Sequence, residues 1–257
     1  MTLLEIRNLS KRFGGLAAIQ DLDLDVNEGE LLSIIGPNGA GKTTLFNVIS
    51  GVYAPTKGEI SFAGDDVTGL KPRRVAAKGI IRTFQANTFF QDTTVLENVA
   101  LGNHLNHKVH FIGELFNSRA ARRREEETQQ KALQLLELFG LANLKDELAE
   151  SLSHGHQRAL GIVIAVAANP RLLLLDEPAS GLNPVETEAI MAKIKQVRDN
   201  GVTVAVIEHD MRLVMGLSDR IVVLNYGKKI AEGLPGEIRE NDAVIEAYLG
   251  TEQEWQE

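Results

Sequence analysis

Apolar and polar residues alternate along three short segments near the start of the chain. Residues 3–7 and 22–26 place an apolar side chain at every second position, and residues 59–62 do the same between Gly58 and Gly64. A period of two is typical of strands with one buried and one exposed face, and the flanking glycines favour turns. These segments therefore predict an antiparallel β layer in the first part of the chain.

Four other segments are apolar at nearly every position: residues 31–35, 172–175, 202–207 and 221–224. Strands with both faces covered have this pattern, as in a parallel sheet that lies between layers of helices. The first segment is followed by a glycine-rich stretch and then by residues 42–50, which suit a helix. The pattern predicts an α/β core built on a mostly parallel sheet.

Between about residues 86 and 168 the period changes to that of a helix. Leu133, Leu136, Leu138 and Leu141 fall on one amphipathic face, with Glu137 at its border. The preceding residues 118–130 are dense in charge and carry no core pattern. We interpret this region as a helical subdomain inserted into the core. A single domain, residues 1–257, would then combine a core of about residues 1–85 and 169–257 with a helical insert at about residues 86–168.

Composition restricts the classes of function. A chain of 257 residues, 44% hydrophobic and 24% charged, suits a globular domain with a full core. The formal net charge of −8 argues against broad nucleic-acid binding, which needs a basic face. The absence of cysteine excludes disulfides, thiolate metal sites and cysteine nucleophiles. The longest apolar run, residues 159–168, is far shorter than the roughly 20 residues that span a bilayer, so we expect any membrane role to depend on a partner.

The segment after the first apolar strand matches the P-loop pattern G-x-x-x-x-G-K-[ST] in full. Its residues are Gly36, Pro37, Asn38, Gly39, Ala40, Gly41, Lys42 and Thr43. In such a loop, successive backbone N–H groups and the start of the following helix bind phosphates. Lys42 is expected to reach the β- and γ-phosphates, and Thr43 to place its hydroxyl on Mg²⁺. We include Thr44 in this predicted site for ATP and Mg²⁺.

Polar residues follow two of the other apolar strands directly. Asp176 and Glu177 come after residues 172–175, and His209 comes shortly after residues 202–207. The carboxyl ends of parallel strands form the ligand-binding edge of α/β sheets. Asp176 suits an Mg²⁺-binding carboxylate, and Glu177 suits a base that polarises the attacking water. His209 is placed to reach a γ-phosphate, although a lone histidine is more often structural or solvated.

The order of these motifs resembles that of the nucleotide-binding subunit of an ABC transporter. The set consists of residues 36–43, Gln85, residues 153–157, 172–177, 180–183 and His209. The resemblance implies a P-loop NTPase fold with a RecA-like core, an antiparallel β layer and a helical signature subdomain. It also implies that two cassettes close head to tail around two ATP molecules, so that the P-loop of one faces the signature of the other. ATP hydrolysis would then drive membrane subunits.

The resemblance also assigns individual roles. Gln85 is similar to the Q-loop glutamine, which contacts Mg²⁺ and water and links to the membrane partner. Glu177 is similar to the catalytic base, and His209 to the switch histidine at the γ-phosphate. Phe13 occupies the place of the aromatic residue that stacks on adenine, with an ordinary core or edge aromatic as the alternative.

The signature segment fits the frame Leu-Ser-x-Gly-x-Gln through Ser153, Gly155 and Gln157. In the family this segment binds the ATP of the opposite cassette. His154 replaces the first glycine of the usual signature, and Asn183 stands where the D-loop usually has an aspartate. These departures leave open a weakly hydrolysing cassette that regulates a more active one.

Four further segments resemble the ATPase subunits of branched-chain amino-acid importers: residues 82–85, 94–99, 207–211 and 247–250. ATPases for urea uptake and for lipopolysaccharide export share much of this pattern and remain alternatives, as does a soluble ABC-type ATPase. The implied partners are polytopic permease subunits, a second cassette (identical or unlike) and, indirectly, a periplasmic or extracellular substrate-binding protein, with no nucleic acid. The implied location is cytoplasmic, on the inner face of the cell membrane.

Overall fold

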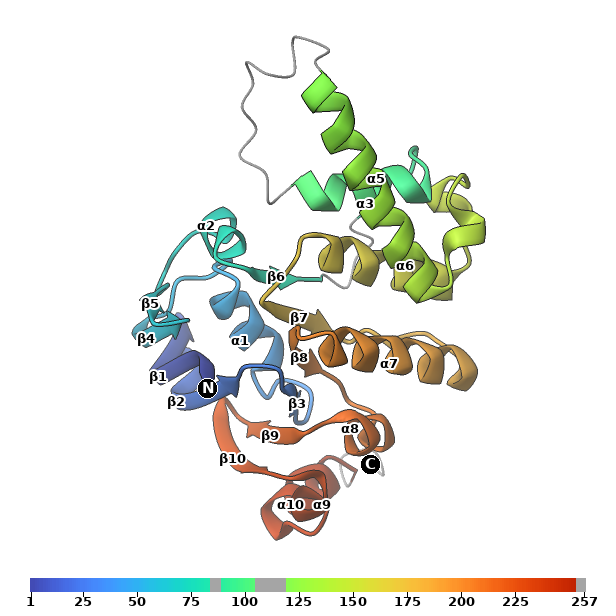
Figure 1. The fold of residues 1–257 in the computed structure, drawn as a ribbon. Helices are drawn as coiled ribbons and strands as arrows, with labels where there is room; N and C mark the ends of the chain where they lie inside the picture. The colour runs from blue at the N-terminus through green and yellow to red at the C-terminus, as the bar shows by residue number, and fades with distance from the viewer. Residues whose placement is uncertain (84–88, 105–118, 253–257) are drawn as a thin grey trace.

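The computed structural model describes residues 1–83, 89–104 and 119–252. Their strands form two sheets, with helices on both sides of the larger one (Figure 1). Gln85, one of the predicted site residues, lies outside the described residues.

The smaller sheet is antiparallel, with strand order β2-β1-β4-β5. Its strands are β1 (Thr2–Phe13), β2 (Leu16–Asn27), β4 (Lys57–Phe62) and β5 (Asp65–Asp66). Along β1, Leu4, Ile6 and Leu9 are fully buried, whereas Arg7 is exposed. The predicted antiparallel layer is confirmed, and β1 and β2 are longer than the alternation indicated.

The larger sheet has the strand order β10-β9-β3-β8-β7-β6. Its strands are β3 (Leu31–Ile35), β6 (Ile80–Arg82), β7 (Leu172–Asp176), β8 (Thr203–Ile207), β9 (Arg220–Asn225) and β10 (Lys228–Gly233). The four predicted apolar strands are its central members, and their mutual pairings are all parallel. The predicted α/β core is therefore confirmed. The sequence pattern missed β6, which has three residues, and β10, which pairs antiparallel with β9 at the sheet edge.

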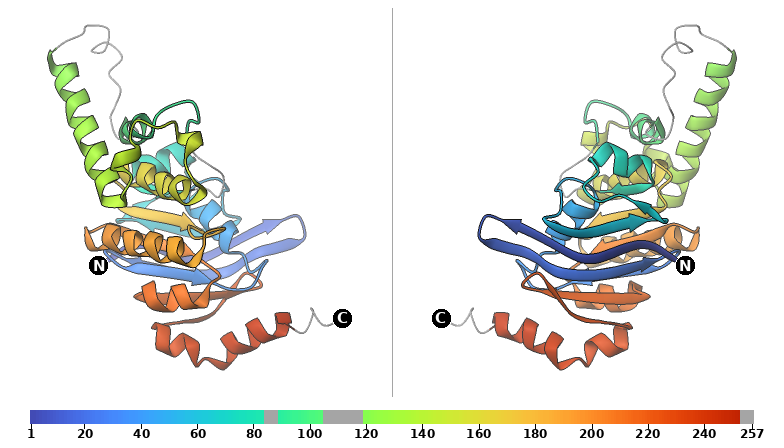
Figure 2. Two further views of the ribbon diagram at one scale, coloured as in Figure 1. Left: turned by 90° about the vertical axis from the view of Figure 1, so that its right-hand side faces the viewer. Right: turned by 90° about the vertical axis from the view of Figure 1, so that its left-hand side faces the viewer.

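The helices fall into two groups (Figures 1 and 2). α3 (Val95–His104), α5 (Arg119–Phe139) and α6 (His154–Ala167) pack on one another at one end of the molecule, with the short 3₁₀ turns η1 (Ala142–Leu144) and η2 (Ala149–Ser151) between them. The others are α1 (Lys42–Ile49), α2 (Pro72–Ala77), α7 (Pro184–Asp199), α8 (Met211–Leu217), α9 (Pro235–Arg239) and α10 (Asp242–Glu252). Helices thus dominate the part of the chain where the sequence has helical periodicity.

The two faces of β7 belong to two different hydrophobic clusters. Leu172 and Leu174 of β7 pack with α1 and the antiparallel sheet, whereas Leu173 and Leu175 pack with α6 and α7. Successive side chains of a strand point to opposite faces, so one continuous apolar run serves both clusters. This double burial holds the central strands, and the loops at their ends, in fixed positions.

Within the charged segment, residues 119–130 are helical, and the side chains at positions 123, 125–127, 129 and 130 are exposed. α5 runs through them, and Arg123 and Glu127 form an exposed ion pair of 3.8 Å, one helical turn apart. Figure 2 shows α5 extending beyond the rest of the molecule. Among the described helices, α5 included, we find none with the length and apolar character that a bilayer span requires.

Candidate functional site

The P-loop connects β3 to α1 and is wedged between two other segments. Gly36 has a φ of 147°, and a side chain there would meet the backbone oxygen of Leu224 at 2.0 Å. Gly41 has a φ of 103°, and a side chain there would approach the backbone oxygen of Ala18 to 2.5 Å. Both positions therefore require glycine for steric reasons.

α1 begins without a side chain that caps it. Its N-cap is Gly41, which has no side-chain hydrogen bond to the first turn. The first backbone N–H groups of a helix lack partners within it, and the helix dipole adds positive potential at this end. Thr43 is exposed and Thr44 half-buried in this first turn, and Asn38 and Gly39 are exposed in the loop before it. The start of α1 is therefore suited to bind an anion.

Lys42 folds back over its own loop. Its Nζ donates to the carbonyl oxygens of Gly36 at 2.6 Å and Pro37 at 3.0 Å, and the residue is buried. Burial lowers the pKa of Lys42, and the charges of Glu177 and Asp176 oppose this shift. The charges of Asp176 and Glu177 act on Lys42, so the P-loop lysine lies near both carboxylates at the carboxyl end of β7.

Asp176 and Glu177 differ in their surroundings. Asp176 is the last residue of β7 and is 3% exposed, and its Oδ2 accepts a hydrogen bond of 2.8 Å from Arg82. Glu177 is half-buried and has a φ of +48°, a left-handed conformation that is costly for a residue with a side chain. Such strain tends to occur at functional sites. Its backbone N–H donates to the Ile207 oxygen at 3.0 Å, which ties the carboxyl ends of β7 and β8 together.

His209 follows β8, which lies between β3 and β7 in the sheet. Its side chain is 63% exposed, with Nδ1 3.9 Å from Glu208 Oε2. Glu208 itself is 2% exposed, and its Oε1 accepts a hydrogen bond from the Ala179 N–H at 3.1 Å. The His209 N–H donates to Glu208 Oε2 at 3.3 Å. Glu208 therefore joins the loop after β7 to the loop that carries His209.

Phe13 lies at the end of β1 and is 41% exposed. Its ring packs edge to face on Tyr53, with centroids 5.2 Å apart. Lys11 Nζ lies 5.0 Å from the Phe13 centroid and donates to the Ala54 oxygen at 2.8 Å. Phe13 thus has a fixed orientation and an accessible ring, as a platform for a flat ligand requires.

The signature residues lie at the start of α6, in the other group of helices (Figure 1). Ser153 is the N-cap, and its Oγ accepts a hydrogen bond from the His156 N–H at 3.4 Å. A side chain at Gly155 would meet Glu186 Oε1 of α7 at 2.7 Å, so this glycine allows close helix packing. The Gln157 side chain donates to the Glu150 oxygen at 3.3 Å.

The structure thus brings the P-loop, Asp176, Glu177 and His209 to one edge of the sheet and leaves Ser153, Gly155 and Gln157 on another element. Sequence reasoning assigned no role to Glu208, Arg82 or Tyr53. A carboxylate that directly follows four consecutive apolar strand residues was the available signal for Glu208. Arg82 and Tyr53 contact Asp176 and Phe13, respectively, which are distant from them in the sequence, so no local pattern pointed to them.

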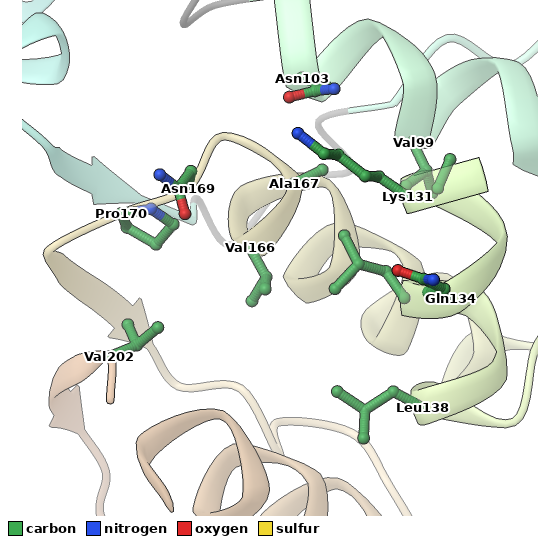
Figure 3. A pocket seen from close by; sticks show the side chains of 12 residues that line it. Val99, Asn103, Lys131, Gln134, Leu138, Val166, Ala167, Asn169, Pro170 and Val202 are labelled. Atoms are coloured by element: carbon green, nitrogen blue, oxygen red, sulfur yellow. The ribbon is translucent and has the colours of Figure 1, made fainter. Parts of the chain in front are cut away.

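A pocket in the described part of the chain lies away from these residues. It has a volume of about 560 Å³ and lies between α3, α5 and α6 and the segments that precede β7 and β8 (Figure 3). Val99, Leu138 and Val202 contribute apolar surface, and Lys131 contributes a charge. Since these segments lead into the amino ends of the strands, the pocket is at the opposite edge of the sheet from the P-loop.

The chain matches two family models. The model of the ABC transporter family matches residues 19–180, and that of the branched-chain amino acid ATP-binding cassette transporter matches residues 228–254. The chain is 45% identical to the high-affinity branched-chain amino acid transport ATP-binding protein BraF of Pseudomonas aeruginosa, over 96% of this chain and 98% of that protein. It is 42% identical to the corresponding protein LivG of Escherichia coli, with the same coverage.

Solved structures agree with these matches. The ADP conformation of an ATP-binding cassette of an ABC transporter superposes with a TM-score of 0.85, at 33% identity, over 97% of this chain and 99% of that chain. A dimeric bacterial ABC transporter cassette superposes with a TM-score of 0.77, at 28% identity, over 91% of this chain and 99% of that chain.

Proposed function

The chain belongs to the ABC transporter family, and we propose that it is the ATP-binding and ATP-hydrolysing subunit that powers a membrane importer of branched-chain or other hydrophobic amino acids. One observation carries the ATPase function: the P-loop, Asp176, Glu177 and His209 meet at the carboxyl edge of β3, β7 and β8. Two observations support the substrate class. The relatives BraF and LivG, which are named as branched-chain amino acid transport ATP-binding proteins, align with this chain over 98% of their length, and a family model for such transporters matches residues 228–254.

In the proposed site, residues 36–44 bind the triphosphate of ATP. Backbone N–H groups at the start of α1 contact the phosphates, and Lys42 exchanges its bonds to Gly36 and Pro37 for bonds to the β- and γ-phosphates. Phe13 stacks on the adenine ring.

The residues around Asp176 suit Mg²⁺. Its Oδ1 is buried and makes no hydrogen bond in the described structure, and a buried carboxylate oxygen is a typical ligand atom for a hard cation. Thr43 and Gln85 are the other proposed ligands. Mg²⁺ would neutralise charge on the phosphates.

Hydrolysis is assigned to Glu177 and His209. Glu177 polarises the attacking water as a general base, and His209 contacts the γ-phosphate from the neighbouring strand end. Glu208 positions both loops, since its carboxylate accepts from the Ala179 and His209 N–H groups.

A second cassette completes the site. Ser153, Gly155 and Gln157 lie at the start of α6, and this helix packs with α3, α5 and α7. We propose that these residues bind the ATP held by the P-loop of an identical or unlike partner cassette, with residues 86–168 as the helical subdomain that carries the signature. A dimeric cassette among the similar structures supports this arrangement.

The remaining partners follow from the transporter role. We propose that the chain binds polytopic permease subunits on the inner face of the cell membrane, and that a substrate-binding protein outside that membrane delivers the amino acid to them. Co-purification of the chain with a polytopic membrane protein tests this part of the proposal.

The ATPase function is tested by replacing Glu177 with glutamine, which keeps the shape but removes the base. We expect the rate of ATP hydrolysis to fall by about 100-fold or more, with ATP binding retained. A phosphate-release assay measures the rate of hydrolysis, and a fluorescent ATP analogue measures nucleotide binding. Glu188→Gln, on the exposed side of α7, is the matched control.

Unchanged hydrolysis in Glu177→Gln would refute the assignment of the base. Negligible hydrolysis by the unsubstituted chain, alone and with its permease, would favour the regulatory cassette instead.

A further inference from the structure

Arg82 is a buried cation whose role is not assigned above. It ends β6, and its side chain is 5% exposed. Nη1 donates to Asn47 Oδ1 at 2.8 Å and to Ser50 Oγ at 3.3 Å, and the guanidinium lies 5.7 Å from the centroid of Phe46. These three residues belong to α1 or its C-terminal end, so one face of Arg82 is anchored to the helix that follows the P-loop.

The other side of the guanidinium holds Asp176. Nη2 donates to Asp176 Oδ2 at 2.8 Å, in an ion pair that is almost fully buried on both sides. Asp176 Oδ1 makes no hydrogen bond in the described structure. Of the two carboxylate oxygens, Oδ2 thus accepts a hydrogen bond from Arg82, whereas Oδ1 has no hydrogen-bond donor in the described structure.

This geometry depends on arginine in particular. The planar guanidinium presents several N–H donors in a rigid fork, so it can bond α1 and β7 at the same time. Through the charge-assisted bond to Oδ2, the anchored fork fixes the orientation of the carboxylate.

We infer that Arg82 is a positioning residue for the metal site: it binds Oδ2 of Asp176, fixes the orientation of this carboxylate, and leaves Oδ1 for the Mg²⁺ of the bound nucleotide. The inference rests on the proposed function, since it takes Asp176 as the metal ligand.

The test measures metal-dependent binding without hydrolysis. The full chain is titrated with Mg²⁺, from EDTA upward, in the presence of a fluorescent, non-hydrolysable ATP analogue. For Arg82→Met we expect the half-saturating Mg²⁺ concentration to rise by about 10–100-fold, the usual effect of losing a residue that orients a metal ligand. Affinity for the analogue in EDTA should change much less.

Arg220→Met is the matched control. Arg220 is also largely buried and ion-paired, with Glu30 at 2.6 Å and with Glu232, but it lies at the opposite edge of the sheet, at the start of β9. Its loss removes both of these ion pairs but leaves the surroundings of Asp176 intact, so we expect the Mg²⁺ titration to match that of the unsubstituted chain. An equal Mg²⁺ response in Arg82→Met and Arg220→Met overturns the inference and leaves Arg82 a purely structural role.

Arg82→Lys keeps the test decisive if Arg82→Met does not fold. A single ammonium group retains the charge but cannot span Asn47 and Asp176 as the fork does, so its Mg²⁺ half-saturation should also rise. A folded Arg82→Lys with an unchanged titration overturns the inference. Failure of the proposed function looks different: the unsubstituted chain itself then shows no Mg²⁺-dependent binding of the analogue.

Discussion

At the scale of single residues, Glu208 is a buried carboxylate that accepts hydrogen bonds from two loops. Burial raises the pKa of Glu208 and outweighs the opposing effects of the N–H groups of Ala179 and His209 and of the His209 charge; the charge of Glu177 raises it further. A carboxyl group with a raised pKa in the folded state binds a proton more tightly there than in the unfolded chain. Its contribution to stability is therefore present below its ordinary value of 4.5 and is lost as the pH rises through the folded pKa.

Glu208→Gln removes this titration and keeps an oxygen that can accept from Ala179. We expect the variant to gain stability relative to the unsubstituted chain as the pH rises above 4.5, by roughly 1 kcal/mol for each unit by which the pKa is raised. Urea unfolding at several values between about pH 5 and pH 8 measures the difference. Glu188→Gln is the exposed control, and a parallel pH profile for both variants contradicts the prediction.

At the scale of an element, α7 shows how a departure from the family pattern is accommodated. Asn183 is its N-cap and forms a reciprocal capping box: the Glu186 N–H donates to Asn183 Oδ1 at 3.0 Å, and the Asn183 N–H donates to Glu186 Oε2 at 3.1 Å. Asparagine and aspartate are about equally effective as N-caps. The replacement of the usual aspartate therefore preserves the start of this helix.

Asn183→Ala removes the side-chain cap and leaves the Glu186 N–H without its partner. We expect the free energy of unfolding to fall by about 1 kcal/mol, measured by urea denaturation. Asn183→Asp should retain the cap and remain within a few tenths of a kcal/mol of the unsubstituted chain. Equal stability of the alanine and aspartate variants would show that the capping box does not stabilise α7.

At the scale of the whole molecule, the nucleotide site and the signature lie on different parts of the fold. The P-loop follows β3 of the central sheet, whereas Ser153 begins α6 in the group formed with α3 and α5 (Figure 1). A helix start such as this one offers backbone N–H groups to an anion. In the proposed head-to-tail pair, that anion is the γ-phosphate held by the partner.

Glu177→Gln should therefore dimerise in the presence of ATP and Mg²⁺ and remain monomeric without nucleotide, as measured by sedimentation velocity. Adding Ser153→Ala to this variant should abolish the ATP-dependent dimer, because the signature loses its hydroxyl and its helix cap. Ser151→Ala, in the preceding 3₁₀ turn, is the control and should leave the dimer intact. If Glu177→Gln remains monomeric at saturating ATP and Mg²⁺, the partner is an unlike cassette rather than a second copy of this chain.

Much of the fold follows from local patterns. Alternation predicted β1, β2 and β4 of the antiparallel sheet, and uninterrupted apolar runs predicted β3, β7, β8 and β9, because burial on one or both faces leaves a recognisable pattern in the sequence. β6 has only three residues, too few for a period, and β10 is paired by its hairpin with β9 rather than by burial. Pairing between strands supplies the information that these two segments lack.

The candidate site divides in the same way. The sequence by itself predicted the P-loop, Asp176 and Glu177 as site residues, because a phosphate-binding loop needs glycines at set positions and parallel strands bring their carboxyl ends to one edge. For His209 the deciding signal was the order of the motifs along the chain. The ion pair between Arg82 and Asp176 joins residues 94 positions apart, and the bond from Ala179 to Glu208 joins residues 29 apart. Only the tertiary structure decided these contacts. Which charges are buried together depends on how β6, β7, β8 and α1 pack, and no local pattern of side chains encodes that arrangement.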